Sequence, residues 1–228
     1  MLEGATEKYG IVLPDRQLGC APITSSEGRA YFGAMAASSN YAWANRQVIM
    51  HMVRKVFSGM FDIQYEEMNL VYDVAHNVAK REEHVVDGRQ MKLCVHRKGA
   101  TRAFGPGCAD LPREYAPWGQ PVIIPGSMGT SSYLLHGTNE AMVRTFGSTC
   151  HGSGRIMSRT KAKKALSGRE VRESLAAEGI IIRAPHDGAI ADEAPEVYKP
   201  SDEVVRIVDS AGISRLVARF VPLGVIKG

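Results

Sequence analysis

The sequence has no stretch of about 18 consecutive apolar residues, the minimum that a membrane-spanning helix needs. The apolar segment 216–226 is interrupted by Arg219 and Pro222. The N-terminus lacks the basic and then apolar pattern of a secretory signal, and the four cysteines form no C-x-x-C pair. Widely spaced cysteines in a chain of 228 residues indicate free thiols in a reducing compartment. These absences predict a cytoplasmic protein with no membrane association.

Several signature motifs are absent as well. The sequence contains no G-x-x-x-x-G-K-S/T loop, no G-x-G-x-x-G fingerprint, and neither H-x-H nor H-E-x-x-H. Walker-type and Rossmann-type nucleotide sites and the common zinc motifs are therefore excluded. An apolar content of 44% with 23% charged residues excludes a disordered chain.

Positive charge is concentrated in two segments. The net charge of +4 is too small to identify a partner. Residues 155–172, however, hold seven Lys and Arg against the single acid Glu170, and Arg97, Lys98 and Arg102 form a second cluster. Basic segments beside glycine-rich loops favour the phosphates of a nucleotide or a nucleic-acid backbone. A solvated helix face is the alternative interpretation.

The periodicity of apolar residues predicts a mixed fold. One long helix or two abutting ones are predicted over 27–57, with a stop at Ser58-Gly59. Strand patterns occupy 70–75, 91–96, 122–124, 131–135 and 213–226. Helical patterns occupy 159–178, with a break at Gly168, and 201–210, with a cap at Ser201-Asp202-Glu203. The segments 103–120 and 184–200 are predicted to be loops. Because strands and helices mix without a βαβ rhythm, we expect an α+β or irregular α/β fold.

Two glycine loops and one histidine are candidates for phosphate chemistry. In Pro125–Thr130 the glycines allow the backbone to approach an anion while Ser127 and Thr130 offer hydroxyls. In Cys150–Arg155, His151 precedes two glycines. Both loops are also consistent with ordinary tight turns.

A neutral imidazole at His151 can attack phosphorus and form a phosphoramidate. A Cys150–His151 dyad is disfavoured, because adjacent residues of an extended segment point to opposite faces. The competing interpretation of His151 is a surface histidine beside basic residues. His76, at the end of the 70–75 strand pattern, is either a satisfied core histidine or a metal ligand, and Lys227 is either held by a packed apolar tail or solvated.

Seven motifs, taken in order, resemble one known family. They are LPDRQL (13–18), GAMAA (33–37) with WANRQ (43–47), DVAHN (73–77), VHRKGATRA (95–103), PGSMGT (125–130), HGSGRIMSR (151–159) and PLGVIKG (222–228). The chain is similar to RtcB-type tRNA-splicing ligases, which join RNA ends with GTP and manganese. The resemblance covers 1–228 but only the C-terminal half of the single large catalytic domain. The family's other metal ligands, among them an acid, a cysteine and two histidines, would lie upstream of Met1.

The resemblance implies a role for individual residues. His151 would become guanylylated, His76 would bind manganese, and Lys98, Arg155 and Arg159 would contact phosphates or RNA. The implied nucleotide-binding residues are His76, Asn77, Pro125, Gly126, Ser127, Met128, Ser132, His151, Gly152, Ser153, Gly154, Tyr198 and Lys227, with Tyr198 and Lys227 at the guanine.

The resemblance also implies a reaction and partners. An RNA 3′-phosphate or 2′,3′-cyclic phosphate would be joined to a 5′-hydroxyl through a histidine–GMP intermediate, with two Mn²⁺ ions in the complete enzyme. RNA, the missing N-terminal half and an archease activator are the implied partners, and poor solubility or self-association is expected of the half-chain. The alternative is a truncated, inactive fragment that binds guanine nucleotide or RNA.

Overall fold

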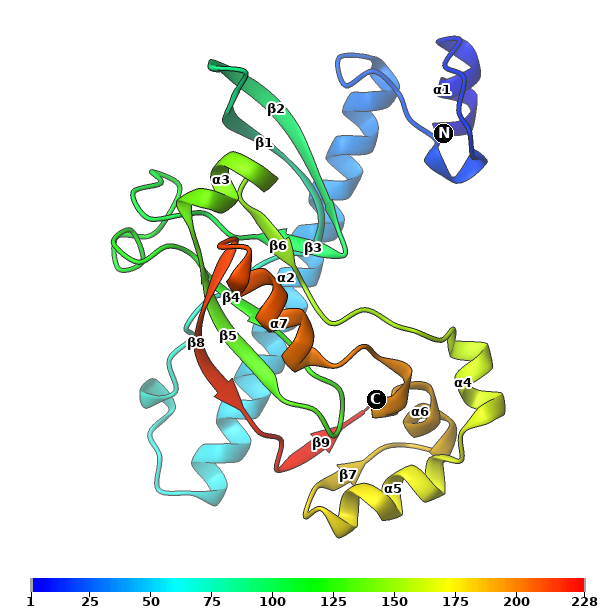
Figure 1. The fold of residues 1–228 in the computed structure, drawn as a ribbon, viewed down its shortest axis with the longest axis vertical. Helices are drawn as coiled ribbons and strands as arrows, with labels where there is room; N and C mark the ends of the chain where they lie inside the picture. Colours follow the sequence, from blue (N-terminus) through cyan, green and yellow to red (C-terminus); the bar gives the residue numbers. More distant parts are fainter. Residues whose placement is uncertain (1, 228) are drawn as a thin grey trace. The chain divides into compact units, whose positions relative to one another are not determined.

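The computed structural model describes residues 2–227, so Met1 and Gly228, the two ends of the domain predicted over 1–228, lie outside the described residues. The chain divides into two compact units, Met1–Val71 and Tyr72–Gly228 (Figure 1). Helices and small, mostly antiparallel sheets are mixed irregularly along the chain. The predicted α+β class is therefore confirmed. Within residues 2–227, no helix is long and apolar enough to cross a membrane.

The first unit consists mainly of one long helix. Its elements are α1 (Leu2–Lys8), the 3-10 turn η1 (Arg16–Leu18), α2 (Ser26–Met60) and the 3-10 turn η2 (Tyr65–Glu67). The Ser25 hydroxyl caps α2 by accepting a hydrogen bond from the Gly28 N–H. The helix predicted over 27–57 is confirmed as a single helix, which continues through Ser58-Gly59 and ends at Met60.

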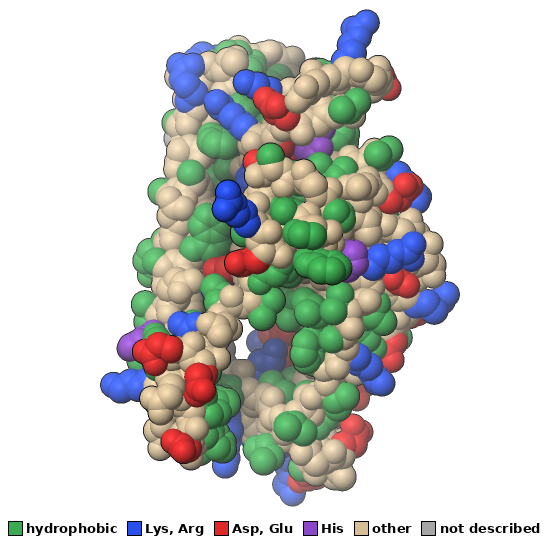
Figure 2. All heavy atoms as spheres, turned by 90° about the vertical axis from the view of Figure 1, so that its left-hand side faces the viewer, with side chains coloured by type: hydrophobic (Ala, Val, Ile, Leu, Met, Phe, Trp, Pro, Cys, Tyr) green, Lys and Arg blue, Asp and Glu red, His purple; other side chains and the backbone are tan. Residues whose placement is uncertain are grey.

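Apolar side chains remain exposed on α2. Val48, Ile49, Met52, Val56 and Met60 are each at least 53% exposed. In the second unit, Leu223 and Ile226 are more than 80% exposed, and Figure 2 shows apolar side chains lying among charged ones on one face of the molecule. Exposed apolar surface of this kind marks a place where another polypeptide can pack.

Within residues 72–227 the strands form four small sheets. The elements of this unit are β1 (Asn77–Val86), β2 (Arg89–Lys98), β3 (Ala100–Arg102), β4 (Pro121–Ile124), β5 (Ser132–Gly137), α3 (Asn139–Thr145), β6 (Ser148–Cys150), α4 (Arg159–Ala165), α5 (Gly168–Ala177), β7 (Ile181–Arg183), α6 (Asp187–Asp192), the 3-10 turn η3 (Pro195–Val197), α7 (Ser201–Ser210), β8 (Ser214–Phe220) and β9 (Gly224–Ile226). The sheets are β1–β2, β3–β6 and β4–β5–β8, all antiparallel, and the parallel pair β7–β9.

Two apolar cores support these sheets. The first packs Val205 of α7 against Val122, Ile124, Tyr133 and Leu135 of β4 and β5. The second joins α4, α5, α6 and β7, and its buried members are Met128, Ala162, Val171, Leu175, Ile180, Ile182, Ile190, Ala194 and Val197. Ile124 belongs to the first core and Met128 to the second, so the loop between β4 and β5 connects the two.

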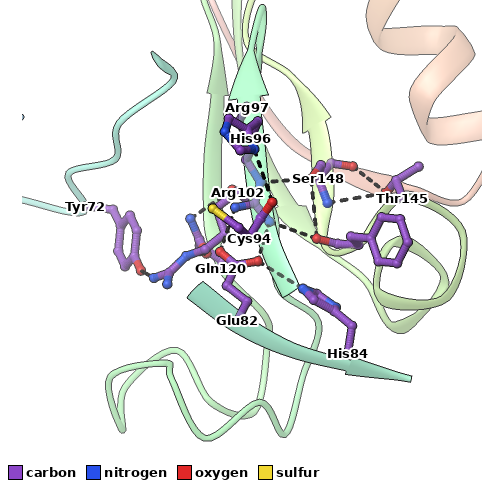
Figure 3. Close-up of polar contacts among 11 residues, drawn as sticks. Tyr72, Glu82, His84, Cys94, His96, Arg97, Arg102, Gln120, Thr145 and Ser148 are labelled. Atoms are coloured by element: carbon purple, nitrogen blue, oxygen red, sulfur yellow. Dashed lines mark hydrogen bonds and ion pairs between the residues drawn. The ribbon is translucent and has the colours of Figure 1, made fainter. Parts of the chain in front are cut away.

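A buried polar cluster lies on the β1–β2 hairpin. Arg97 on β2 and Glu82 and His84 on β1 are each at most 6% exposed. The two terminal nitrogens of Arg97 donate to the two carboxylate oxygens of Glu82 at 2.6 and 2.8 Å, and His84 Nε2 lies 2.9 Å from Glu82 Oε2 (Figure 3). Burial alone would raise the pKa of Glu82, but the hydrogen bonds from Arg97 and His84 outweigh burial and hold this pKa below its ordinary value.

Most elements predicted from the sequence are confirmed. The patterns at 91–96, 122–124 and 131–135 correspond to β2, β4 and β5, and 103–120 has no helix or strand. The helical signal over 159–178 corresponds to α4 and α5, and the helix from Ser201 to Ser210 is α7.

Four predictions are wrong in detail. Residues 70–75 form no strand, because β1 begins at Asn77, where its partner β2 ends at Lys98. The predicted loop 184–200 contains α6, capped by the His186 side chain, and η3. Ser201 does not cap α7: Pro200 holds that position, and the Ser201 hydroxyl donates to Ser131 O at 2.8 Å. The segment 213–226 forms two strands, separated around Pro222, which has no N–H for a ladder.

Replacing Glu82 by Gln tests the buried cluster. The variant leaves the Arg97 charge buried without its counter-ion, so we expect the free energy of unfolding to fall by about 3–5 kcal/mol. Because the pKa of Glu82 is lowered in the folded state, its stabilising contribution is fully present above about pH 4.3 and is lost as the pH falls through the folded-state pKa.

In denaturant titrations, the free energy of unfolding of the wild type should therefore fall more steeply below about pH 4.3 than that of Glu82→Gln. Glu83→Gln changes the exposed neighbour on β1 and is the matched control, with an expected loss of about 0.5 kcal/mol or less. Equal stabilities of the two variants at neutral pH would contradict the prediction.

Candidate functional site

His76 and His151, predicted separately as metal ligand and nucleophile, lie face to face. Their ring centroids are 4.5 Å apart and the ring planes meet at 19°. His76 is exposed, whereas His151 is partly buried. The structure therefore brings together two residues that are far apart in the sequence.

The strand register around Gly99 explains this meeting. Asn77 of β1 pairs with Lys98, and Ala100 of β3 pairs with Cys150 of β6. His76 and His151 each lie one residue beyond these pairs, so both rings flank the corner at Gly99, whose φ is +70°. The His151 N–H donates to the Gly99 carbonyl at 3.5 Å, which ties β6 to the corner.

The surroundings favour a neutral imidazole at His151. Burial is the main cause that lowers the pKa of His151, and the neighbouring His76 and Lys98 lower this pKa further by charge repulsion. A neutral ring keeps a lone pair for attack on phosphorus. At Cys150, burial raises the pKa of the thiol, so this cysteine is held in its protonated, weakly nucleophilic form.

The predicted guanosine loop has a shape fixed by its own hydroxyls. The Gly126 N–H donates to Ser132 Oγ at 3.0 Å, and the Ser127 N–H donates to Thr130 Oγ1 at 2.7 Å. A Cβ at Gly126 would lie 2.4 Å from the carbonyl oxygens of Thr130 and Ser131, so only glycine fits there. Met128 is 1% exposed and belongs to the second core. Contacts within the chain therefore hold this loop in its shape.

A second set of contacts connects the turn after His151 to Tyr198. Gly154, with φ +75°, accepts a hydrogen bond from the Lys199 N–H at 3.0 Å. Arg155 forms an antiparallel bridge with Tyr198, and its guanidinium carbon lies 5.0 Å from the centre of the tyrosine ring. The short segment 152–154 thus joins the histidine pair to the residues predicted to bind guanine.

Glu193, which follows α6, is a residue that the sequence analysis missed. Its carboxylate accepts a hydrogen bond from the Tyr198 hydroxyl and lies 3.3 Å from Arg155, 3.2 Å from Arg159 and 3.7 Å from Lys227. It therefore connects four residues that were each predicted to bind nucleotide or phosphate. In the sequence, Glu193 is marked only as one of several acidic residues in the segment 187–196.

The tail that carries Lys227 is held mainly by strand pairing and not by packing of the predicted apolar run, because Leu223 and Ile226 are exposed. β9 pairs with β7, and the Lys227 N–H donates to the Arg183 carbonyl at 2.8 Å. Tyr198, whose ring also packs against the second core, has its pKa raised mainly by burial, with a further contribution from the hydrogen bond to Glu193. Both predicted guanine contacts are therefore held in place by the fold.

The three predicted phosphate ligands differ in how far they are already engaged. Arg155 donates from Nε to Met157 O, from Nη1 to Tyr198 and Glu193, and from Nη2 to Asp192 O. Arg159 has a side chain that is 69% exposed, and Lys98 is exposed at the end of β2. Lys98 and Arg159 are therefore the better placed of the three to reach a phosphate.

No complete metal site occurs in the part of the chain that the structure describes. Across residues 2–227, no group of three or more His, Cys, Asp and Glu side chains is arranged to hold an ion. His76 can supply one imidazole, but manganese favours carboxylate, carbonyl and water oxygens as its main ligands, and structural and catalytic metal sites need several protein ligands. The described residues alone do not fit a resident metal.

Replacing Glu193 by Gln tests the network around it. The variant removes the charge that Arg155, Arg159 and Lys227 share, and we expect an unfolding free energy lower by about 1.5–3 kcal/mol. Glu173→Gln is the matched control, because Glu173 pairs with Arg169 on the surface of α5, where the acid is 61% exposed. The control should change stability by about 0.5 kcal/mol or less. Indistinguishable urea midpoints for the two variants would refute the role of Glu193.

Comparison with known proteins agrees with the sequence motifs. A family model described as tRNA-splicing ligase RtcB matches residues 1–228. The tRNA-splicing ligase RtcB of Archaeoglobus fulgidus is 62% identical over 230 residues, which are 100% of this chain and 48% of that protein. The corresponding protein of Methanococcus maripaludis is 56% identical over 229 residues, again 100% of this chain and 48% of the relative.

The protein of the same name from Methanocaldococcus jannaschii is 57% identical over 230 residues, which are 100% of this chain and 24% of that longer relative. The chain thus spans about half the length of the first two curated relatives. The family match over the whole chain, together with these identities, shows that the chain belongs to the tRNA-splicing ligase RtcB family.

Proposed function

We propose that this chain is the C-terminal part of the catalytic domain of an RNA ligase that acts in tRNA splicing and RNA repair. The ligase would join an RNA 3′-phosphate or 2′,3′-cyclic phosphate to a 5′-hydroxyl with GTP as the second substrate. The single observation that carries the proposal is the partly buried His151 imidazole, stacked on His76 at 4.5 Å and with its pKa lowered. Membership of the tRNA-splicing ligase family supports the RNA substrate.

His151 would act as the nucleophile. Its neutral nitrogen attacks the α-phosphorus of GTP, an N–P bond forms, and the bond to pyrophosphate breaks. An RNA 3′-phosphate oxygen then attacks the same phosphorus, which breaks the N–P bond and releases the imidazole. Finally the 5′-hydroxyl of the second RNA attacks the activated 3′-phosphate, and GMP leaves. A cyclic phosphate end would first be opened to the 3′-phosphate.

The loop and the network would hold the nucleotide. Pro125, Gly126, Ser127, Met128 and Ser132 would surround the guanosine, and Tyr198 and Lys227 would pack on and recognise the base. Asn77 and the turn of Gly152, Ser153 and Gly154 would lie along the transferred phosphate. Support comes from the hydrogen bonds that hold the loop and from the contacts that tie Tyr198 and Lys227 to Glu193.

RNA would contact the exposed cations. Lys98 adjoins the histidine pair, and Arg159 lies beyond the turn that follows His151. Both are exposed, so each can donate to a phosphate without leaving a buried partner unpaired. Arg155 would act on phosphate with fewer free donors. An archease is proposed as an activating partner only on the strength of the family resemblance.

Manganese would need polypeptide beyond this chain. When bound, the metal would neutralise charge on the phosphates. His76 would supply one ligand, and the others are assigned to the remaining half of the protein, because residues 2–227 bring no three candidate ligands together. The exposed apolar side chains of α2 and β9 support packing against that missing part.

A second function has its own support. Without partner ligands for His76, the chain is a catalytically inactive fragment that binds guanine nucleotide or RNA. The lack of a group of metal-ligating side chains among residues 2–227 favours this alternative for the isolated chain. The two candidates differ in whether a covalent bond to His151 forms when the missing half is present.

Labelling with GTP that carries a radioactive α-phosphate distinguishes them. With manganese, we expect no label on the chain alone, because orphaned metal ligands cost orders of magnitude in activity. We expect acid-labile label once the remaining half is added as a separate polypeptide. His151→Asn should abolish that label, whereas His96→Asn, at an exposed histidine of β2, should retain it.

Label that persists in His151→Asn would overturn the assignment of the nucleophile. A complete lack of label with both halves present, while the chain still binds GTP, would favour the binding fragment instead.

A further inference from the structure

Arg97 and Arg102 flank Lys98-Gly99 in the basic cluster for which the sequence left phosphate binding and a solvated face both open. The structure gives them different surroundings. Arg97 is 3% exposed, and Arg102 lies with its guanidinium carbon 4.5 Å from the centre of the Phe104 ring. Each arginine is bound to protein groups on several sides, so neither is arranged as a free phosphate ligand (Figure 3).

Arg97 holds the start of β6. Besides its two bonds to Glu82, it donates from Nε to Ser148 Oγ at 2.8 Å and from Nη2 to the Phe146 carbonyl at 2.8 Å. The Thr145 hydroxyl donates to the Ser148 carbonyl at 2.6 Å. Ser148 is therefore fixed through both its side chain and its backbone, three residues before His151.

Arg102 holds the segment that leads to His76. Its Nε donates to the Gln120 side-chain oxygen at 2.9 Å, and the Gln120 amide donates back to the Arg102 carbonyl at 2.8 Å. Gln120 is fully buried, so this reciprocal pair fixes the guanidinium. Nη2 of Arg102 then donates to the Tyr72 hydroxyl at 3.3 Å, and the Tyr72 ring packs edge-on against Tyr115 at 5.4 Å.

Tyr72 lies four residues before His76 in a segment that forms no strand. Residues 72–76 lie outside the strands, and the bond from Arg102 to the Tyr72 hydroxyl is one of the contacts that hold this segment. The two histidines therefore have parallel supports: Arg97 through Ser148 for His151, and Arg102 through Tyr72 for His76.

We propose that Arg97 and Arg102 are positioning residues, which set the distance and angle between the His76 and His151 rings rather than binding substrate. This role rests on the proposed function, because it concerns the reaction of His151. The ring geometry, however, can be measured without any reaction. A displacement of about 1 Å in a reacting group can cost on the order of a hundredfold in rate, so supports of this kind matter even when they add little stability.

Two mild variants test the proposal without creating a buried charge. Ser148→Ala removes only the hydroxyl that receives Arg97 Nε–H, and Tyr72→Phe removes only the hydroxyl that receives Arg102 Nη2–H. Ser148→Thr restores a hydroxyl and should behave as the wild type. Ser174→Ala on α5 and Tyr41→Phe on α2 are the matched controls, because both residues are exposed.

The first measurement is proton NMR of the chain with isotope-labelled histidine rings. The wild type should show a nuclear Overhauser effect between the His76 and His151 rings, because they stack at 4.5 Å. We expect each hydroxyl deletion to weaken this effect at least about twofold and the double variant to weaken it more, with the controls and Ser148→Thr unchanged. The buried His84 ring reports whether each variant keeps its fold.

The second measurement is guanylylation in the presence of the remaining half. We expect each deletion to lower the maximal rate about three- to tenfold and to leave the KM for GTP within about twofold, because the guanine contacts are distant from both hydroxyls in the hydrogen-bond network. A ring–ring effect that is the same in the double variant and the wild type would overturn the positioning role. A weakened effect without any guanylylation of the wild type would instead count against the proposed function alone.

Discussion

The ion pair between Arg97 and Glu82 is the contact on which the arrangement of the site depends. A two-stranded ribbon such as β1–β2 has little stability of its own, and burying two charges gains little net free energy over burying apolar residues. The value of this pair is geometric. Arg97 is fixed by both carboxylate oxygens, and its remaining donors bind the Phe146 carbonyl and the Ser148 hydroxyl. The hairpin is thereby locked to β6, and through β6 to His151.

Charge is distributed differently over the two halves of the candidate site. At the histidine pair, burial and the neighbouring His76 and Lys98 lower the pKa of His151 and favour its neutral imidazole, a state that suits a nucleophile. Around Tyr198, one carboxylate at Glu193 balances Arg155, Arg159 and Lys227. The turn from Gly152 to Gly154 leads from His151 to Arg155, which forms a bridge with Tyr198, so this short turn connects the group that would react to one of the groups that would recognise the base.

The sequence predicted elements well where a helical or alternating pattern was strong, as in α2, β2, β4 and β5. It missed β1, because the charged run 80–83 interrupts the alternation of apolar and polar residues that marks a strand. The burial of Glu82 can be understood only once Arg97 is known to lie beside it. The motifs gave individual roles to His76 and His151, but not their stacking, which depends on pairings between distant strands. Glu193 was missed for the same reason, since its partners come from three segments, at 155–159, 198 and 227.

The left-handed corner at Gly99 has a consequence for how this protein can vary. A Cβ at this position would meet nothing within 4 Å, so the backbone angle of +70° is the only obstacle to a larger residue. Asparagine and aspartate tolerate that angle best, while β-branched residues tolerate it worst. A change there to valine or isoleucine would alter neither imidazole nor any charge, yet it would bend the one corner at which both rings meet. Harmful inherited changes in this protein can therefore fall on a residue that has no side chain.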